Sequence, residues 1–342
     1  MVKTRIVYLD VVRVVACCMI VLMHSPHPEA GLPGMLLSPL SYVTAAGIGL
    51  FFMVSGALLL PIKMETLAFL KRRLGKIIGP LLFWTLFYLI ANVIYGKMSL
   101  QELAEALITI PFSAQGHGVL WFMYTLAGLY LLAPIISAFL VRASRKEIWF
   151  YILLWIVALC YPLLSLFLDV NRTTTGVLYY FMGYAGYFVL GYYMHVYKTW
   201  INPIFIFALV VLPLLFFFFH RYYSLNGDFF DVFGYLSITV MMLCVVVFYG
   251  IRRAVESLQL GEINLLTQVS NACFGIYLMH IFVMRYVLWN CDFIVCSFGG
   301  IGQLVITWLL TLFFSFVITW AWSFMPYSEY MIGYTNYRKT KI

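Results

Sequence analysis

Charged residues are scarce in this chain, and their scarcity excludes a water-soluble globular protein. Only 10% of the 342 residues are Asp, Glu, Lys or Arg, and 64% are hydrophobic, whereas roughly a quarter of the residues in soluble domains are charged. The sequence also lacks the alternation of apolar and polar residues that a membrane β-barrel needs. Its apolar residues form runs of about 20, enough for a helix to cross the hydrocarbon core. The sequence therefore predicts an all-α, polytopic membrane helix bundle.

Metal-binding and redox motifs are also missing. The seven cysteines show no C-x-x-C or other metal-ligand spacing, so we expect no metal cofactor and treat most of them as small hydrophobes. Cys291 and Cys296 lie in a short predicted outer loop, where either a disulfide or two free thiols would fit.

Ten apolar runs predict about ten transmembrane helices. They cover residues 5–24, 41–60, 74–95, 119–141, 148–168, 176–197, 201–219, 229–249, 270–289 and 299–322. The first run contains Asp10 and Arg13 and no small-residue cleavage site, so we interpret it as a retained helix. Short loops and the absence of a convincing internal repeat predict a single domain over residues 1–342.

The formal charge of +8 is explained by membrane topology. With a cytoplasmic N-terminus, the inner side collects Lys3, Arg5, Lys63, Lys71, Arg72, Arg73, Lys76, Arg142, Arg145, Lys146, Lys198, Arg252, Arg253, Arg338, Lys339 and Lys341. This distribution follows the positive-inside rule and predicts that both termini are cytoplasmic. It leaves no basic surface to attract nucleic acid, so we expect no such partner.

Two connecting segments have helical spacing of apolar residues beside charges. Residues 96–118 predict a helix on the outer membrane face or a plain amphipathic connector. Residues 252–268, which include Arg252, Arg253 and Glu256, show a similar pattern on the inner side.

The first predicted helix carries three ionisable residues. Asp10 and Arg13 are spaced to pair across one turn, which offsets part of the free-energy cost of burying both. His24 follows Arg13 by eleven residues, which places it within roughly 20° of the same face and about 16 Å further along the axis. Such a stripe is typical of a helix that faces an internal tunnel, because polar groups rarely face lipid. A lone histidine at a helix end is otherwise interfacial and solvated.

A family resemblance rests on this helix and on further segments in order. They are LDVVRVVACCMIVLMH (9–24), FFMVSGALLL (51–60), KRRLGKIIGPLLFW (71–84), HGVLWFMYTLAGLYLLAP (117–134), GYFVLGYYM (186–194) and SNACFGIYLMH (270–280). Together they resemble the integral-membrane acyltransferase-3 family over nearly the whole chain. The W-F-x-Y and G-I-Y-L-x-H blocks are most similar to the branch that contains the enterobacterial common antigen O-acetyltransferase.

The resemblance implies a membrane O-acyltransferase. Such an enzyme moves an acyl group, usually acetyl, from cytoplasmic acetyl-CoA or another acyl-CoA to a sugar hydroxyl of a surface glycan or lipid-linked glycan. The chain departs from the family's R-x-x-R motif, where it has Arg73 followed by Lys76, and it lacks the esterase-like domain of some members. It keeps the charge but loses one guanidinium fork.

These expectations assign roles to particular residues. We expect His24 to be the catalytic base, with Arg13 positioning the donor and Asp10 orienting Arg13. A covalent acyl-enzyme on histidine, serine or tyrosine is an alternative route that the sequence leaves open. We expect Arg72, Arg73 and Lys76, beside Lys71, to bind the phosphates of coenzyme A, although ordinary positive-inside anchoring would use the same residues. Gly56, next to Ser55, is expected to allow close helix packing.

Four further residues are candidates for acceptor binding. His117 and Trp121 lie at the entrance of the predicted fourth span, where tryptophan is also the common interfacial residue. His280 lies within the ninth span and is either a tunnel residue or a packing hydrogen bond. Arg285 would attract an anionic acceptor or extend to the lipid headgroups.

Two other classes of function remain open from the sequence. A transporter of a small molecule or glycolipid would also have an internal polar stripe, but the chain has no paired repeat. A scaffold or receptor would leave the polar residues of the first helix with a packing role alone. The size of the chain and the lack of a eukaryotic targeting signal predict a multi-pass protein of the bacterial inner membrane.

Overall fold

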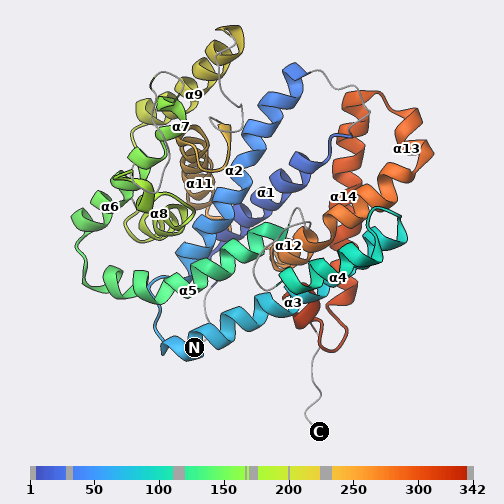
Figure 1. Ribbon diagram of the computed structural model, residues 1–342. Helices are drawn as coiled ribbons and strands as arrows, with labels where there is room; N and C mark the ends of the chain where they lie inside the picture. The colour runs from blue at the N-terminus through green and yellow to red at the C-terminus, as the bar shows by residue number, and fades with distance from the viewer. Residues whose placement is uncertain are drawn as a thin grey trace. The chain divides into compact units, whose positions relative to one another are not determined.

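The computed structural model describes residues 5–27, 34–110, 120–165, 168, 176–198, 201–223 and 233–336. Every regular element in these ranges is a helix (Figure 1). The prediction of an all-α fold is therefore confirmed. Among the described residues, eight helices are long and apolar enough to cross a membrane, so the predicted count of ten is not confirmed.

Figure 1 labels most of the helices. The described helices are α1 (Val7–His24), α2 (Gly34–Leu59), α3 (Thr66–Ile94), α4 (Leu100–Thr109), α5 (Trp121–Arg142), α6 (Arg145–Ala158), α7 (Tyr161–Leu164), η2 (Tyr179–Phe181), α8 (Ala185–Val196), α9 (Pro203–Tyr223), α11 (Ile238–Ser257), α12 (Asn264–Phe282), η3 (Val283–Val287), η4 (Leu288–Asn290), α13 (Asp292–Ser297), α14 (Gly300–Trp322) and α15 (Glu329–Ile332).

The chain forms two compact units that interleave along the sequence. Unit 1 comprises Met1–Met23, Pro33–Pro61 and Ile135–Leu266. Unit 2 comprises His24–Leu32, Ile62–Pro134 and Thr267–Ile342. The single domain expected from the sequence stays a prediction.

Local sequence signals explain where several helices depart from the predicted spans. Ser144 and Glu147 form a reciprocal capping box, so α6 begins at Arg145 and not at residue 148. The predicted span 176–197 yields only the 12 residues of α8, because Gly183 adopts a φ of 109° between η2 and α8. Hydropathy alone registers neither the cap nor the left-handed glycine.

The core of unit 1 is the contact of α2 with α8 and α11. Phe52, Met53, Tyr187 and Phe188 are fully buried there. The two backbones approach closely because Gly56 faces the Phe188 carbonyl and Gly191 faces the Met53 carbonyl. Small residues at such crossings allow the van der Waals packing that associates helices in lipid. The prediction that Gly56 serves helix packing is confirmed.

Unit 2 is held together by side-chain hydrogen bonds from α3. Trp84 Nε1 donates to the Met331 carbonyl at 2.8 Å, which fastens α15 to α3. Tyr88 Oη donates to the Leu278 carbonyl of α12, also at 2.8 Å. The aromatic rings of Phe87 and Phe282 pack edge to face 4.9 Å apart, so α3 and α12 are joined by both polar and apolar contacts.

The two amphipathic segments have different outcomes. Residues 100–109 form α4, whose Ser99–Glu102 capping box fixes its start; hydrogen bonds from Ser99 to the Glu102 carboxylate lower the pKa of that group. The inner segment 252–268 is not a surface helix. It contains the end of α11 and the start of α12.

Arg252, one of the charges of that segment, is not exposed. Its side chain is buried at 6% exposure. The guanidinium donates to the Met194 carbonyl at the end of α8, contacts Glu256 at 3.0 Å and lies 5.2 Å from the centre of the Tyr8 ring. Free carbonyls at a helix C-terminus favour such a cation, which explains why Arg252 is buried.

We expect alanine at Gly56 or Gly191 to destabilise the protein. A Cβ at Gly56 would lie 1.7 Å from the Phe188 oxygen, and one at Gly191 would lie 2.0 Å from the Met53 oxygen. Forcing backbones apart in a packed core lowers stability by about 1–3 kcal/mol or more. Thermal unfolding in detergent measures this loss. Gly250→Ala is the matched control, because nothing lies within 4 Å of its added Cβ, and equal melting temperatures for all three variants would contradict the packing argument.

Candidate active site

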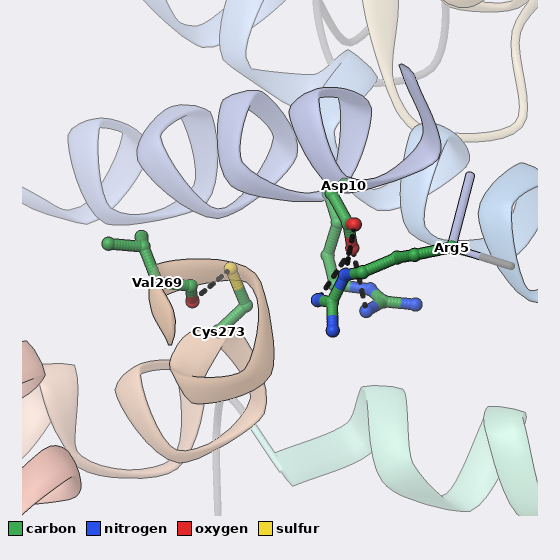
Figure 2. Close-up of polar contacts among 5 residues, drawn as sticks. Arg5, Asp10, Val269 and Cys273 are labelled. Carbon is green, nitrogen blue, oxygen red and sulfur yellow. Dashed lines mark hydrogen bonds and ion pairs between the residues drawn. The ribbon is translucent and has the colours of Figure 1, made fainter. Parts of the chain in front are cut away.

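In unit 1, the buried carboxylate of Asp10 is held by two arginines. Arg5 donates from Nε to Oδ2 at 2.5 Å and from Nη2 to Oδ1 at 3.0 Å (Figure 2). Arg13 Nη1 lies 3.7 Å from Oδ1. The predicted Asp10–Arg13 pair is thus confirmed, but its distance is that of an ion pair without a hydrogen bond, and Arg5 is the closer partner.

Arg5 is a residue whose role was not predicted from the sequence. The sequence analysis counted Arg5 only as an inner-side charge. In the structure Arg5 precedes α1, and its side chain extends along the first turn of that helix to Asp10. Two parallel N–H···O bonds to a carboxylate are the strongest ion-pair geometry that arginine forms. The signal in the sequence is a cation just before a helix whose first turn contains an acid.

In unit 2, His24 and His280 lie side by side. Their ring centres are 5.4 Å apart and their planes are tilted by 40°. His24 is the last residue of α1, and His280 lies near the end of α12 with no exposed surface. The sequence singled out both residues but predicted separate roles for them, because 256 residues separate them along the chain. Only tertiary structure brings the two imidazoles together.

The His280 ring is oriented by the backbone of its own helix. Its Nδ1 lies 2.6 Å from the Tyr277 carbonyl oxygen. Its Nε2 is buried and has no hydrogen-bond partner among the described residues. The tyrosine ring is tilted against the imidazole at 5.8 Å, so Tyr277 contacts His280 through both its ring and its carbonyl.

A cation and two aromatic rings continue this cluster beyond His280. Arg285 lies in η3, a π-helical turn that follows α12. Such turns often occur at functional sites. Its guanidinium lies 5.6 Å from the Trp289 ring centre. His27 packs edge to face on the same tryptophan at 4.9 Å. Trp289 and His27 were not predicted as site residues, since neither belongs to a recognisable motif.

The remaining acceptor candidates lie on or before α5. Trp121 is the first residue of α5 and is half-buried. Its neighbour Phe122 packs edge to face on Tyr277 at 5.3 Å, which places the start of α5 beside the helix that carries His280. His117 lies outside the described residues.

The three candidate ligands for coenzyme A lie near the start of α3 in unit 2. Arg72 and Lys76 are exposed, and Arg73 is half-buried. Arg73 precedes Tyr88 by 15 residues on α3, which corresponds to about 22 Å along a helix axis. Because Tyr88 bonds to α12 two residues from His280, the basic cluster is remote from the two histidines within unit 2.

The described cysteines behave as buried or half-buried side chains. Cys273 Sγ donates to the Val269 carbonyl at 3.2 Å (Figure 2). Among the described residues, no group of three or more His, Cys, Asp or Glu side chains is arranged to hold a metal ion. The Cys296 side chain lies outside the described residues, so its pairing with Cys291 stays open.

Long apolar helices with ionisable side chains in their interior define a multi-pass membrane protein with a polar site. The acyltransferase-3 family model, described as an acyltransferase domain, matches residues 6–332, and the chain belongs to this family. Family membership indicates a membrane acyltransferase. No curated protein and no solved structure matches the chain.

We expect Asp10→Asn to destabilise the protein, because it leaves two partly buried arginines without their carboxylate. Loss of a hydrogen bond to a charged group lowers the free energy of unfolding by about 1.5–3 kcal/mol. Chemical or thermal unfolding in detergent measures the change. The exposed Asp292→Asn serves as the control, and an Asp10 variant as stable as this control would show that the Arg5 and Arg13 contacts add nothing.

Proposed function

We propose that the protein is an O-acyltransferase, most simply an O-acetyltransferase, of the bacterial inner membrane with both termini in the cytoplasm. It would take the acyl group from cytoplasmic acetyl-CoA or another acyl-CoA. The acceptor would be a sugar hydroxyl of a surface glycan or lipid-linked glycan. The observation that carries this proposal is the pair of imidazoles, His24 and His280, inside a membrane chain of an acyltransferase family. Its placement in the enterobacterial common antigen branch stays a prediction.

The reaction requires a base near the acceptor hydroxyl. In the proposed step the hydroxyl oxygen bonds to the acyl carbon, the carbon–sulfur bond breaks, and His24 takes the hydroxyl proton and returns it to the leaving thiolate. Near neutral pH, a neutral imidazole can accept this proton, and the imidazolium that forms can return it. His24 suits this task because it is half-buried and no described residue hydrogen-bonds to its ring.

Arg13 and Asp10 have supporting roles in this proposal. They precede His24 on the same continuous helix, α1. Arg13 would counter negative charge on the donor, and Asp10 would hold the Arg13 guanidinium in place. The 3.7 Å ion pair between Arg13 and Asp10 supports the role of Asp10 in holding the Arg13 guanidinium.

The donor would enter at the basic cluster of α3. Arg72, Arg73 and Lys76 present three cations of the kind that bind phosphates. An extended acyl-pantetheine arm could then run along α3 toward the level of Tyr88 and His280. Anchoring of α3 at the membrane surface explains the same charges, so a measurement of donor binding decides between the two roles.

The acceptor would bind at the other end of this path. Arg285 beside Trp289 combines a cation with an aromatic face, which suits an anionic sugar or a lipid-linked diphosphate. Trp121 at the start of α5 offers a second aromatic surface near Tyr277. His117 is proposed as a further acceptor ligand from its sequence position alone.

We expect His24→Ala to abolish acyl transfer, because no other group then removes the hydroxyl proton. Membranes that contain the protein are incubated with [14C]acetyl-CoA, and label in the glycan and lipid fractions is counted. The transfer rate should fall at least about 100-fold, the usual contribution of a positioned base. His195→Ala is the matched control, because that imidazole is hydrogen-bonded to Tyr8 and has no role in the proposed transfer.

Two results would contradict this proposal. A folded His24→Ala protein that still transfers label would remove His24 from the mechanism. Movement of a solute or glycolipid across proteoliposomes without consumption of acetyl-CoA would identify the protein as a transporter.

Acetyl-CoA binding should depend on the α3 cluster. Replacing Arg72, Arg73 and Lys76 by Gln should weaken binding to protein in nanodiscs at least about tenfold, since each lost charge-assisted contact contributes about 1.5–3 kcal/mol. Calorimetry measures the dissociation constant. The control replaces Arg142, Lys146 and Arg253, three exposed cations of unit 1, by Gln. Equal weakening in both variants would show a nonspecific effect of charge.

A further inference from the structure

The tautomer of His280 follows from its contact with the backbone. A carbonyl oxygen only accepts hydrogen bonds, so the 2.6 Å contact with Tyr277 requires a proton on Nδ1. In the neutral ring, Nε2 then carries a lone pair and is an acceptor. The orientation and the proton position of this imidazole are therefore set by α12 itself.

The unpaired Nε2 atom is unusual for a buried polar group. His280 has no exposed surface, and Nε2 has no partner among the described residues. Most buried polar atoms are hydrogen-bonded, because an unpaired one in a low-dielectric interior is destabilising by about 1–3 kcal/mol. The unpaired His280 Nε2 can therefore accept a hydrogen bond from a donor group that moves toward it.

His24 is a suitable donor for this nitrogen. Two imidazoles joined by an N–H···N bond have ring centres roughly 5 Å apart, since about 3 Å separates the nitrogens. The observed separation of His24 and His280 is 5.4 Å with a tilt of 40°. No described residue holds the His24 ring by a hydrogen bond, so rotation of this ring can bring one of its N–H groups toward His280. Catalytic hydrogen bonds commonly tighten in this way when substrate binds.

We infer that His280 is a positioning residue for His24. Its Nε2 accepts a hydrogen bond from one ring nitrogen of His24. The second ring nitrogen of His24 then keeps a lone pair that points toward the acceptor hydroxyl. This inference rests on the proposed function and goes beyond it, because it gives His280 a role in proton transfer in place of acceptor binding. The acceptor's proton moves to the free nitrogen of His24 and then to the thiolate of coenzyme A. His280 keeps its own proton throughout.

The test compares two replacements of His280. Gln places an amide oxygen near the position of Nε2 and retains an acceptor, whereas Met fills the space without one. We expect His280→Met to lower kcat about 10- to 100-fold, the range seen when a partner that orients a functional histidine is lost. The KM for acetyl-CoA should stay unchanged. His280→Gln should recover most of kcat.

Tyr88→Phe is the control for packing. It removes the hydrogen bond to Leu278 on the same helix but leaves both imidazoles, so it should lower the melting temperature and preserve kcat. In [15N]histidine NMR, His280 should show the Nδ1–H tautomer, and its Nε2 signal should shift in His24→Ala.

The outcomes separate this inference from the proposed function. If wild-type protein transfers no acyl group, the proposed function fails. If wild type is active and His24→Ala inactive while His280→Met keeps full kcat, the His280 assignment alone fails. If His280→Gln folds and binds acetyl-CoA but is as inactive as His280→Met, His280 is itself the base and the positioning role is overturned.

Discussion

The low dielectric of the hydrocarbon core is the constraint on which the other features depend. A polar side chain there must find a partner inside the protein, because neither water nor lipid supplies one. In unit 1, buried charged side chains have partners within the protein. Asp10 is shared between Arg5 and Arg13, and Arg252 satisfies carbonyls at the end of α8. The close α2–α8 contact through Gly56 and Gly191 then excludes lipid from this core.

Unit 2 meets the same constraint less completely. The buried side-chain nitrogen and oxygen atoms without a partner among the described residues all belong to it, including His280 Nε2, Thr85 Oγ1 and Thr311 Oγ1. Polar atoms of this kind are retained where a substrate or water completes their hydrogen bonds. Unit 2 also contains the two imidazoles and the π-helical turn with Arg285, which are the groups that the proposal assigns to the base and the acceptor site.

Hydropathy predicted much of the fold, and the features that it missed have either local or tertiary causes. The helices α1, α5 and α14 begin and end within a few residues of the predicted spans 5–24, 119–141 and 299–322. The ends of α6 and α8 were wrong, since a capping box at Ser144 and a left-handed Gly183 decide them locally. Arg252 was predicted only as a charge of the inner side, and its burial could not be predicted, because its partners lie on α8 and α1, far away in sequence.

By itself, the sequence determined that the chain is helical and that it belongs in a membrane. It also singled out Asp10, Arg13, His24 and His280 as ionisable residues within membrane spans, where burial of such groups is unfavourable and indicates a function. Composition and periodicity carry that information because each helix must satisfy its own backbone in lipid. Tertiary structure alone decided that His280 lies beside His24 and that Arg252 meets the carbonyls at the end of α8. Side-chain pairing between distant segments depends on how helices pack, and the residues of one helix do not by themselves identify the helix that they meet.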